Sequence, residues 1–298
     1  MTSVHRARIA DGDGRGIEHV ATEWLASFGA DYPVGSVARG RFLLQLIVAC
    51  GPYPVLRDAY FDNLERLLAP LPRRMHPGRL VIGLGSGRCG STSLTALVSS
   101  IAGACATHEN PPLLDWHPRP PQLDLHVRRF TLLAQYFPVV FDAAHWWLNA
   151  APALVAAFPD LRFVGLIRDP NATTRSFMAI KGAGPGTFNH WVAADEGPWR
   201  ASVWDHTYPD YPHPTLIGPA DGSAKAALIG RYVREYHASL AALQRRWPDR
   251  TLLLQTEELS AAKTQRRLYR FIGAGRGVLR DLRLNTSTIE DGAQNFWY

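Results

Sequence analysis

From residue 79 onward, short apolar runs alternate with segments whose apolar residues recur every three or four positions. A short apolar run bounded by glycine or proline is typical of a buried strand, and the longer period is typical of a helix with one buried face. The strand-like runs lie within 79–84, 104–114, 139–148, 161–167 and 251–255. Helical periodicity covers 94–101, 124–137 and 223–247. Because strands that alternate with helices form parallel sheets, we expect a three-layer α/β domain with a mainly parallel sheet.

Residues 1–78 have a different pattern and predict a helical extension. Apolar residues recur at helical spacing over 17–28 and 57–68, and a cluster of prolines at positions 70, 72 and 77 interrupts the chain just before the first strand.

The domain predicted to follow spans 79–298 and contains a proline- and glycine-rich insertion at about 183–222. Loops of this length are usually functional or disordered, and its aromatic residues argue against disorder. We therefore expect either a lid over an acceptor pocket or a packed structural loop.

Composition and charge narrow the class of protein. Of 298 residues, 46% are hydrophobic and 19% charged, as in a globular domain, and the net charge of +6 favours an anionic ligand. No run of Lys and Arg with interleaved aromatic residues is present, so no nucleic-acid partner is expected. Cys50, Cys89 and Cys105 form no C-x-x-C pair, which indicates neither a zinc site nor a disulfide framework. The apolar run at 42–50 is too short to span a bilayer and the first residues lack the apolar core of a signal peptide, so we expect a cytoplasmic protein.

The stretch 79–101, RLVIGLGSGRCGSTSLTALVSSI, combines a strand, a glycine loop and a helix start. Gly85, Gly87 and Gly90 let backbone N–H groups approach phosphate oxygens, and the positive end of the helix faces the same charge. The hydroxyls at 91–93 can add donors and cap the helix. The stretch therefore predicts an anion-binding loop, although an ordinary glycine-rich turn has the same composition.

The loop has the glycine spacing of the P-loop of nucleotide triphosphatases, but Ser91 stands where that motif has lysine. Its single basic residue is Arg88. The segment Arg88-Cys-Gly-Ser-Thr-Ser instead resembles the 5′ loop of sulfotransferases, the family that uses 3′-phosphoadenosine 5′-phosphosulfate (PAPS). The resemblance implies that Arg88, Cys89, Gly90, Ser91, Thr92 and Ser93 hold the 5′-phosphosulfate, and that Arg88 stabilises the bridging oxygen as it leaves.

A second motif follows the strand at 161–167. Arg168-Asp-Pro ends the strand, and Ser176 lies about two helical turns into the next segment, where both side chains can reach one anion. An Arg-Asp-Pro alone would also suit a capped turn. The pattern resembles the 3′-phosphate site of sulfotransferases and, together with the first motif, implies a P-loop-like sulfotransferase domain closest in motif to the tyrosylprotein and glycan types.

The resemblance offers two candidates for the base that deprotonates the acceptor. Glu109 stands soon after the first helix, where the tyrosylprotein-like branch has its glutamate, and His145 precedes Arg168 at a distance comparable to the catalytic histidine of soluble sulfotransferases. The lysine common near this point in the glycan type is absent. We favour Glu109, because two tryptophans beside His145 suggest core packing; a surface carboxylate remains the alternative reading of Glu109.

Three functions fit the sequence. The first is sulfuryl transfer from PAPS, with no metal, to a hydroxyl of a small-molecule, glycan or lipid-like acceptor. The second is a P-loop kinase or nucleotide triphosphatase, weakened by the missing lysine. The third is a non-catalytic module that binds an anionic partner in the same cleft. The sequence does not predict an oligomeric state.

Overall fold

The computed structural model describes residues 17–29, 31–112, 114, 120–181 and 222–274. The insertion predicted at about 183–222 lies outside the described residues except for Gly222, which begins a helix.

A five-stranded sheet with every neighbouring pair parallel forms the centre of the molecule, in the order β2-β3-β1-β4-β5. Its strands are β1 (Arg79–Leu84), β2 (Ala104–His108), β3 (Val139–Ala143), β4 (Arg162–Ile167) and β5 (Thr251–Gln255). The strands at 79–84 and 161–167 were predicted to share one sheet, and they are direct neighbours. Successive residues of β1 face opposite sides, since Val81 and Ile82 belong to different apolar clusters.

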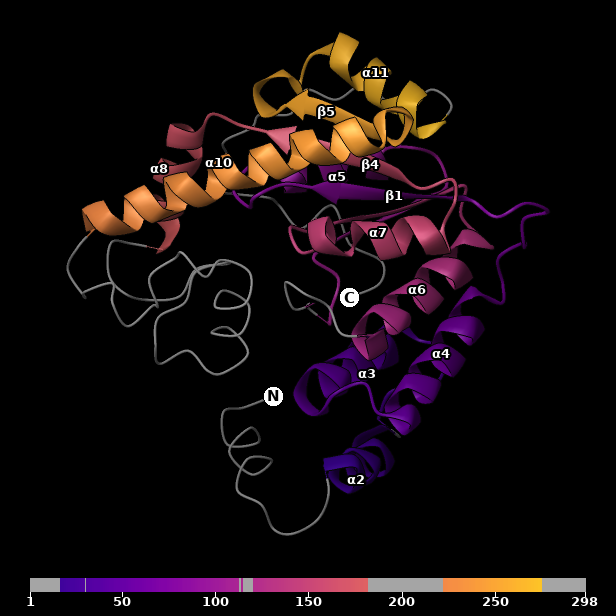
Figure 1. Ribbon diagram of the computed structural model, residues 1–298. Helices are drawn as coiled ribbons and strands as arrows, with labels where there is room; N and C mark the ends of the chain where they lie inside the picture. The colour runs from indigo at the N-terminus through magenta and orange to yellow at the C-terminus, as the bar shows by residue number, and fades with distance from the viewer. Residues whose placement is uncertain (1–16, 30, 113, 115–119, 182–221, 275–298) are drawn as a thin grey trace.

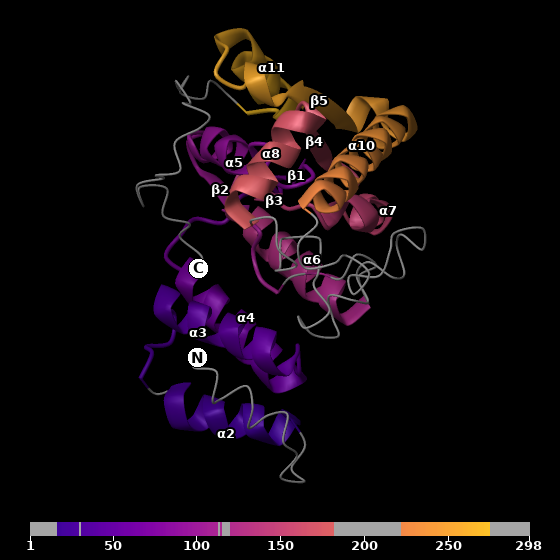
Figure 2. The ribbon, with the colours of Figure 1, turned by 90° about the vertical axis from the view of Figure 1, so that its left-hand side faces the viewer.

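Helices cover both faces of this sheet, so the predicted three-layer α/β fold is confirmed (Figures 1 and 2). On one face, α5 (Ser91–Ser99) and α11 (Ala262–Ile272) pack their apolar residues against Val81 and Val164. On the other face lie the helices whose buried residues share a cluster with Ile82 and Phe163. These helices are α6 (Pro120–Ala134), α7 (Trp147–Ala157), α8 (Pro170–Lys181) and α10 (Gly222–Arg246).

In the described residues before β1, the helices are α2 (Ile17–Gly29), α3 (Val37–Cys50) and α4 (Pro54–Leu68), within the region predicted as a helical extension. Figure 1 shows them as a separate group beside α6. Buried residues of α3 and α4, such as Leu43 and Phe61, belong to the same apolar cluster as Phe130 of α6. The extension therefore packs on the α/β layers through α6.

Two helices differ from the sequence prediction. Helix α6 begins at Pro120, although the apolar period was recognised only from Asp124. Helix α7 was not predicted, because its sequence WLNAAPALVAA is apolar or small nearly all round and contains Pro152, so it shows no helical stripe.

Two short 3-10 turns flank the last strand, at Pro248–Arg250 and Thr256–Glu258. Within the described part of the chain, every helix is too short or too polar to cross a bilayer.

Candidate functional site

The carboxyl ends of the parallel strands bring the predicted site residues to one edge of the sheet. Ala143 at the end of β3 pairs with His108 on one side and Gly83 on the other. Glu109 directly follows β2, and its N–H donates to the carbonyl of Ala143 at 2.9 Å. His145 follows β3, the glycine loop follows β1, and Arg168 follows β4, as expected for a site outside the strand ends of an open α/β sheet.

The loop between β1 and α5 turns through a left-handed backbone. Gly87, Arg88 and Gly90 have φ values of 82°, 52° and 89°. Helix α5 begins at Ser91 directly after Gly90, and no side chain caps it, so the predicted cap from the hydroxyls at 91–93 is wrong. The backbone N–H groups of its first turn therefore lie at the positive end of the helix without a capping side chain as a competing acceptor.

The side chain of Cys89 packs inside the loop, next to Gly85. The side chain is fully buried, and a Cβ added at Gly85 would lie 2.1 Å from its Sγ atom, so only glycine fits there. Thr256 Oγ1 donates to the Cys89 carbonyl at 2.6 Å. Burial raises the pKa of the Cys89 thiol to about 11, so the group stays neutral at physiological pH. Cys89 can therefore contribute its backbone, but not a charged side chain, to anion binding at this loop.

The two arginine motifs meet at this loop. Arg168 Nη1 donates to the carbonyl of Arg88 at 2.6 Å, and Arg88 Nε donates to Ser176 Oγ at 3.3 Å. Partial desolvation of the Arg88 guanidinium and, second, the neighbouring charge of Arg168 lower the pKa of Arg88. Glu257, which follows β5, lies 4.0 Å from Arg168 Nε. The positive charges of Arg88 and Arg168 repel each other, and an anion bound between the two guanidinium groups would relieve that repulsion.

Glu109 has an unusual backbone conformation. Its φ is 50°, and among the described residues only Glu109 and Arg88 combine a positive φ with a side chain other than hydrogen. Such conformations cost about 1–3 kcal/mol and cluster at functional sites. The two residues that the sequence predicted as base and stabiliser therefore both carry local backbone strain.

His145 lies at the same edge but in an aromatic environment. Its ring packs edge-on against Trp146 with centroids 4.8 Å apart, and its carbonyl accepts a hydrogen bond of 2.9 Å from the hydroxyl of Tyr236 in α10. The side chain is half-buried. The position thus combines the strand-end placement of a base with the packing of a core residue.

His108 ends β2 at the same edge of the sheet, and the motifs gave it no role. Its Nε2 atom and Ser91 Oγ share a hydrogen bond of 2.8 Å, which ties the end of β2 to the first residue of α5. Glu257 and Thr256 were also not assigned to the site. Their signal in the sequence is position alone, directly after a predicted strand.

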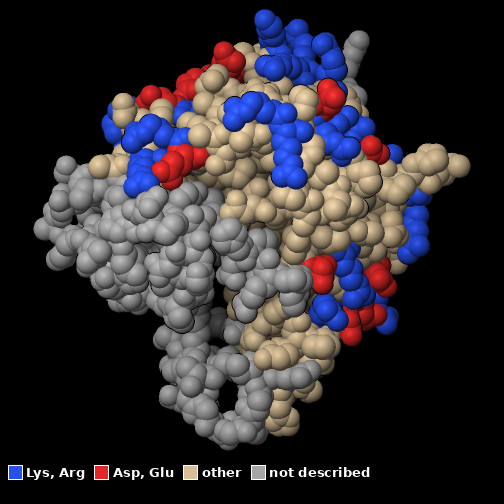
Figure 3. All heavy atoms as spheres, viewed as in Figure 1, with Lys and Arg blue, Asp and Glu red and all other residues tan. Residues whose placement is uncertain are grey.

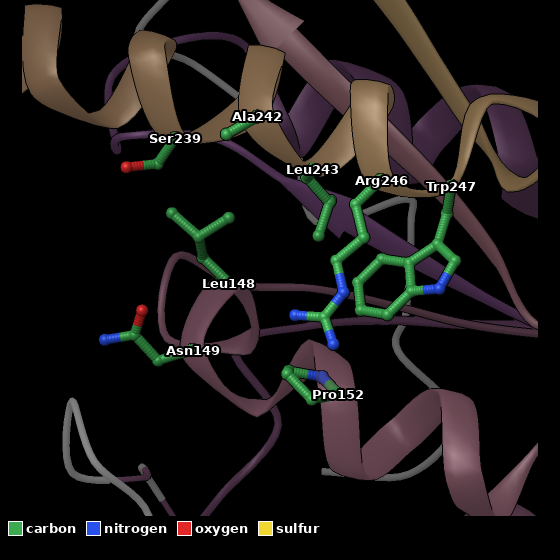
Figure 4. A pocket seen from close by; sticks show the side chains of 8 residues that line it. All are labelled: Leu148, Asn149, Pro152, Ser239, Ala242, Leu243, Arg246 and Trp247. Atoms are coloured by element: carbon green, nitrogen blue, oxygen red, sulfur yellow. The ribbon is translucent and has the colours of Figure 1, made fainter.

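Two other surface features lie apart from these residues. A pocket of about 280 Å³ lies between α7 and α10 (Figure 4) and contains none of the predicted site residues. It is lined by Leu148, Asn149, Pro152, Ser239, Ala242, Leu243, Arg246 and Trp247.

Figure 3 shows Lys and Arg gathered over α11, whose exposed basic residues are Lys263, Arg266, Arg267 and Arg270. The positive charge of the chain is therefore not confined to the strand-end site.

No family model and no curated protein matches the chain. Several solved structures resemble it in fold. Three of these are sulfotransferases.

The enzyme from Alicyclobacillus acidocaldarius is 14% identical, with a TM-score of 0.43 over 72% of this chain and 87% of that one. The sulfotransferase domain of the Synechococcus PCC 7002 olefin synthase is 15% identical, with a TM-score of 0.43 over 69% and 76%. Sulfotransferase STF9 from Mycobacterium avium is 16% identical, with a TM-score of 0.42 over 89% and 86%. Because these identities and TM-scores are low, a functional assignment has to come from the residues of the site.

Proposed function

We propose that the protein is a PAPS-dependent sulfotransferase, which transfers the sulfuryl group of PAPS to a hydroxyl of a small-molecule, glycan or lipid-like acceptor. The observation that carries the proposal is the hydrogen bond of 2.6 Å from Arg168 to the carbonyl of Arg88, across 80 positions of sequence. Arg88 in turn donates to Ser176. The residues that the motifs assign to the two phosphate ends of one nucleotide are therefore linked by hydrogen bonds, which supports a shared site.

The residues present suit a doubly anionic nucleotide. Arg168 and Ser176 would hold the 3′-phosphate, and the backbone of residues 88–93 at the start of α5 would hold the 5′-phosphosulfate. The arginine side chains supply charge, and the uncapped helix start supplies N–H donors. Arg88, in the same loop, would stabilise the negative charge that develops on the bridging oxygen.

Glu109 is the base in this proposal. It would accept the proton of the acceptor hydroxyl as the acceptor oxygen forms its bond to sulfur and the bond from sulfur to the bridging oxygen breaks, which releases adenosine 3′,5′-bisphosphate. The strained backbone of Glu109 favours this assignment, because strain of this kind persists where the surrounding structure maintains it for function. His145, packed on Trp146, is the second candidate.

A nucleotide triphosphatase or kinase on the same fold is the competing function. Such an enzyme needs a lysine in the loop to contact the β- and γ-phosphates. Here the position holds Ser91, whose hydroxyl is bonded to His108. Ser91 therefore places a neutral hydroxyl, already in a hydrogen bond, at the position where the P-loop motif has a phosphate-binding cation.

Calorimetric titration separates these functions. The purified protein is titrated with adenosine 3′,5′-bisphosphate and, separately, with ATP and Mg²⁺, with adenosine 5′-monophosphate as the control that lacks a 3′-phosphate. Tight binding of the bisphosphate alone supports the proposal, whereas preference for ATP and Mg²⁺ would refute it. A screen of hydroxylated acceptors with labelled PAPS then tests for turnover and so distinguishes an enzyme from a binding module.

The proposal includes a metal-independent reaction, because the transferred sulfuryl group carries less charge than a phosphoryl group. EDTA is therefore expected to leave the rate of transfer unchanged. We also propose that the protein acts in the cytoplasm, which fractionation of cells that express the tagged full chain can test.

A further inference from the structure

A cluster of polar side chains lies buried beneath the loop that carries Glu109. His126 and Arg129 come from one face of α6, and Asp142 comes from β3. Their exposed fractions are 0%, 1% and 0%. Groups of this kind are rarely buried without partners, so their partners indicate what the cluster does.

The partners outside the cluster include backbone atoms of the three residues that follow Glu109, 110–112. Arg129 Nη1 donates to the carbonyl of Pro111 at 2.8 Å, and His126 Nε2 donates to the carbonyl of Pro112 at 2.8 Å. From the other side, Asp142 Oδ1 accepts the N–H of Asn110 at 3.4 Å. Together with the bond from the Glu109 N–H to Ala143, four consecutive residues are held by four hydrogen bonds.

The hydrogen bonds define the protonation of the histidine. A carbonyl oxygen only accepts, so Nε2 of His126 must carry the proton, and Nδ1 is then the acceptor for Arg129 Nη2 at 2.5 Å. Burial and, second, the charge of Arg129 lower the pKa of His126 well below its ordinary value, which agrees with a neutral ring. Arg129 thus acts on the loop twice, directly at Pro111 and through His126 at Pro112.

The buried carboxyl of Asp142 accepts two further hydrogen bonds. Thr107 Oγ1 donates to Oδ1 and Trp147 Nε1 donates to Oδ2, each at 2.6 Å. Burial is the main cause that raises the pKa of Asp142, and the hydrogen bonds from Thr107 and Trp147, then the charge of Arg129, oppose it.

Burying ionisable groups is costly, and apolar residues of similar size would often stabilise a core as well. The cluster instead directs its donors and its acceptor to one short loop, whose first residue has a left-handed backbone. We propose that Arg129, His126 and Asp142 are positioning residues that hold the Glu109 loop in the conformation required for its carboxylate to act as the base. This inference deepens the proposed function and rests on it.

A double-mutant cycle tests the inference through turnover. Arg129→Met keeps an unbranched apolar stem but removes the guanidinium donors, and misplacement of the base is expected to lower kcat about 10- to 100-fold. Affinity for adenosine 3′,5′-bisphosphate should stay unchanged. In a Glu109→Gln background the same substitution should have no further effect on kcat, because the base is already lost. An equal fold-loss in both backgrounds, or unchanged kcat in the single variant, would overturn the inference.

Matched variants separate positioning from stability. His126→Gln can still donate to the carbonyl of Pro112 and is expected to keep kcat, whereas His126→Phe removes the donor and should lower it; this pair also serves if Arg129→Met does not fold. Asn63→Ala removes the hydrogen bonds of a buried side chain to two backbone groups of the N-terminal extension, outside the cluster, so it should lower stability and leave kcat of the folded enzyme unchanged. A loss of kcat in Asn63→Ala as large as in Arg129→Met would count against the inference.

Hydrogen exchange provides a readout independent of turnover. The amides of Glu109 and Asn110 should exchange faster in Arg129→Met than in the wild-type protein or in Asn63→Ala. Unchanged exchange would show that the cluster does not hold the loop. If the wild-type protein transfers no sulfuryl group to any acceptor, the proposed function fails, while exchange still decides whether the cluster holds residues 109–112.

Discussion

At the residue scale, the choice between Glu109 and His145 is open to direct test. Both lie at the carboxyl edge of adjacent strands, but Glu109 has the strained backbone and His145 has the aromatic packing. Removing a general base lowers the rate about 10²–10⁴-fold. We expect Glu109→Gln to bind adenosine 3′,5′-bisphosphate normally and to turn over at least about a hundredfold more slowly.

His145→Ala provides the comparison for that measurement. The substitution is expected to have a milder effect on kcat, with some loss of stability from the lost contact with Trp146. If instead His145→Ala is inactive and Glu109→Gln is close to wild type in kcat, the two roles are reversed.

Arg168 offers a test of the nucleotide site. Its side chain is 19% exposed, and its guanidinium is proposed to bind the 3′-phosphate through charged hydrogen bonds. Arg168→Ala should therefore weaken binding of adenosine 3′,5′-bisphosphate by about 1.5–3 kcal/mol, measured by calorimetry. Arg175→Ala is the matched control, because Arg175 is an exposed arginine of α8. Equal affinities in the wild type and in both variants would contradict the assignment.

At the scale of elements, the loop between β1 and α5 depends on contacts from the far edge of the sheet. Gly90 has a φ of 89°, and a Cβ added there would lie 2.9 Å from Cγ2 of Thr256, which follows β5. The same threonine bonds the carbonyl of Cys89. The loop is thus held in place by the turn after β5 as well as by its own strand and helix.

Gly90→Ala should disturb this arrangement in two ways. A left-handed backbone costs alanine about 1–2 kcal/mol, and the contact with Thr256 adds to that cost. We expect lower stability in denaturant unfolding and weaker binding of adenosine 3′,5′-bisphosphate. Adding Thr256→Ser, which removes the methyl group but keeps the hydroxyl, should restore part of the loss. A variant as stable as the wild type, with the same affinity, would show that the loop tolerates a side chain at this position.

At the scale of the whole molecule, the buried Cys89 thiol links folding to alkaline pH. Its pKa rises from an ordinary value of 9.0 to about 11 on folding. A raised thiol pKa means that the folded state favours the neutral form, so its contribution to stability is complete below pH 9 and is lost as pH rises toward 11.

The expected loss from this group is about 2–3 kcal/mol over that interval. Cys89→Ala should remove this part of the pH dependence, although it lowers stability at neutral pH by leaving a small cavity. The measurement is the free energy of unfolding of both proteins as a function of pH. Parallel curves for the two proteins between pH 9 and pH 11 would contradict the link.

Some structural features of this protein can be predicted from local sequence. The strands at 79–84 and 251–255 and the helix at 223–247 could be predicted because apolar periodicity depends only on neighbouring residues. The loop around Arg88 and the pair Arg168 and Ser176 were recognisable for the same reason, since each motif lies within one strand–helix turn. Helix α7 was not predicted, because an almost uniformly apolar segment has no periodic pattern of apolar and polar residues.

The tertiary structure decided what depends on residues far apart in sequence. Sequence alone predicted a parallel sheet, but the order β2-β3-β1-β4-β5 determines that Glu109, His145, the glycine loop and Arg168 follow neighbouring strands. The left-handed backbone of Glu109 and the hydrogen bonds from Arg129 and His126 to its loop have no local signature. Such contacts arise only when folding brings distant elements together, because hydrogen bonding and desolvation act through space and not along the chain.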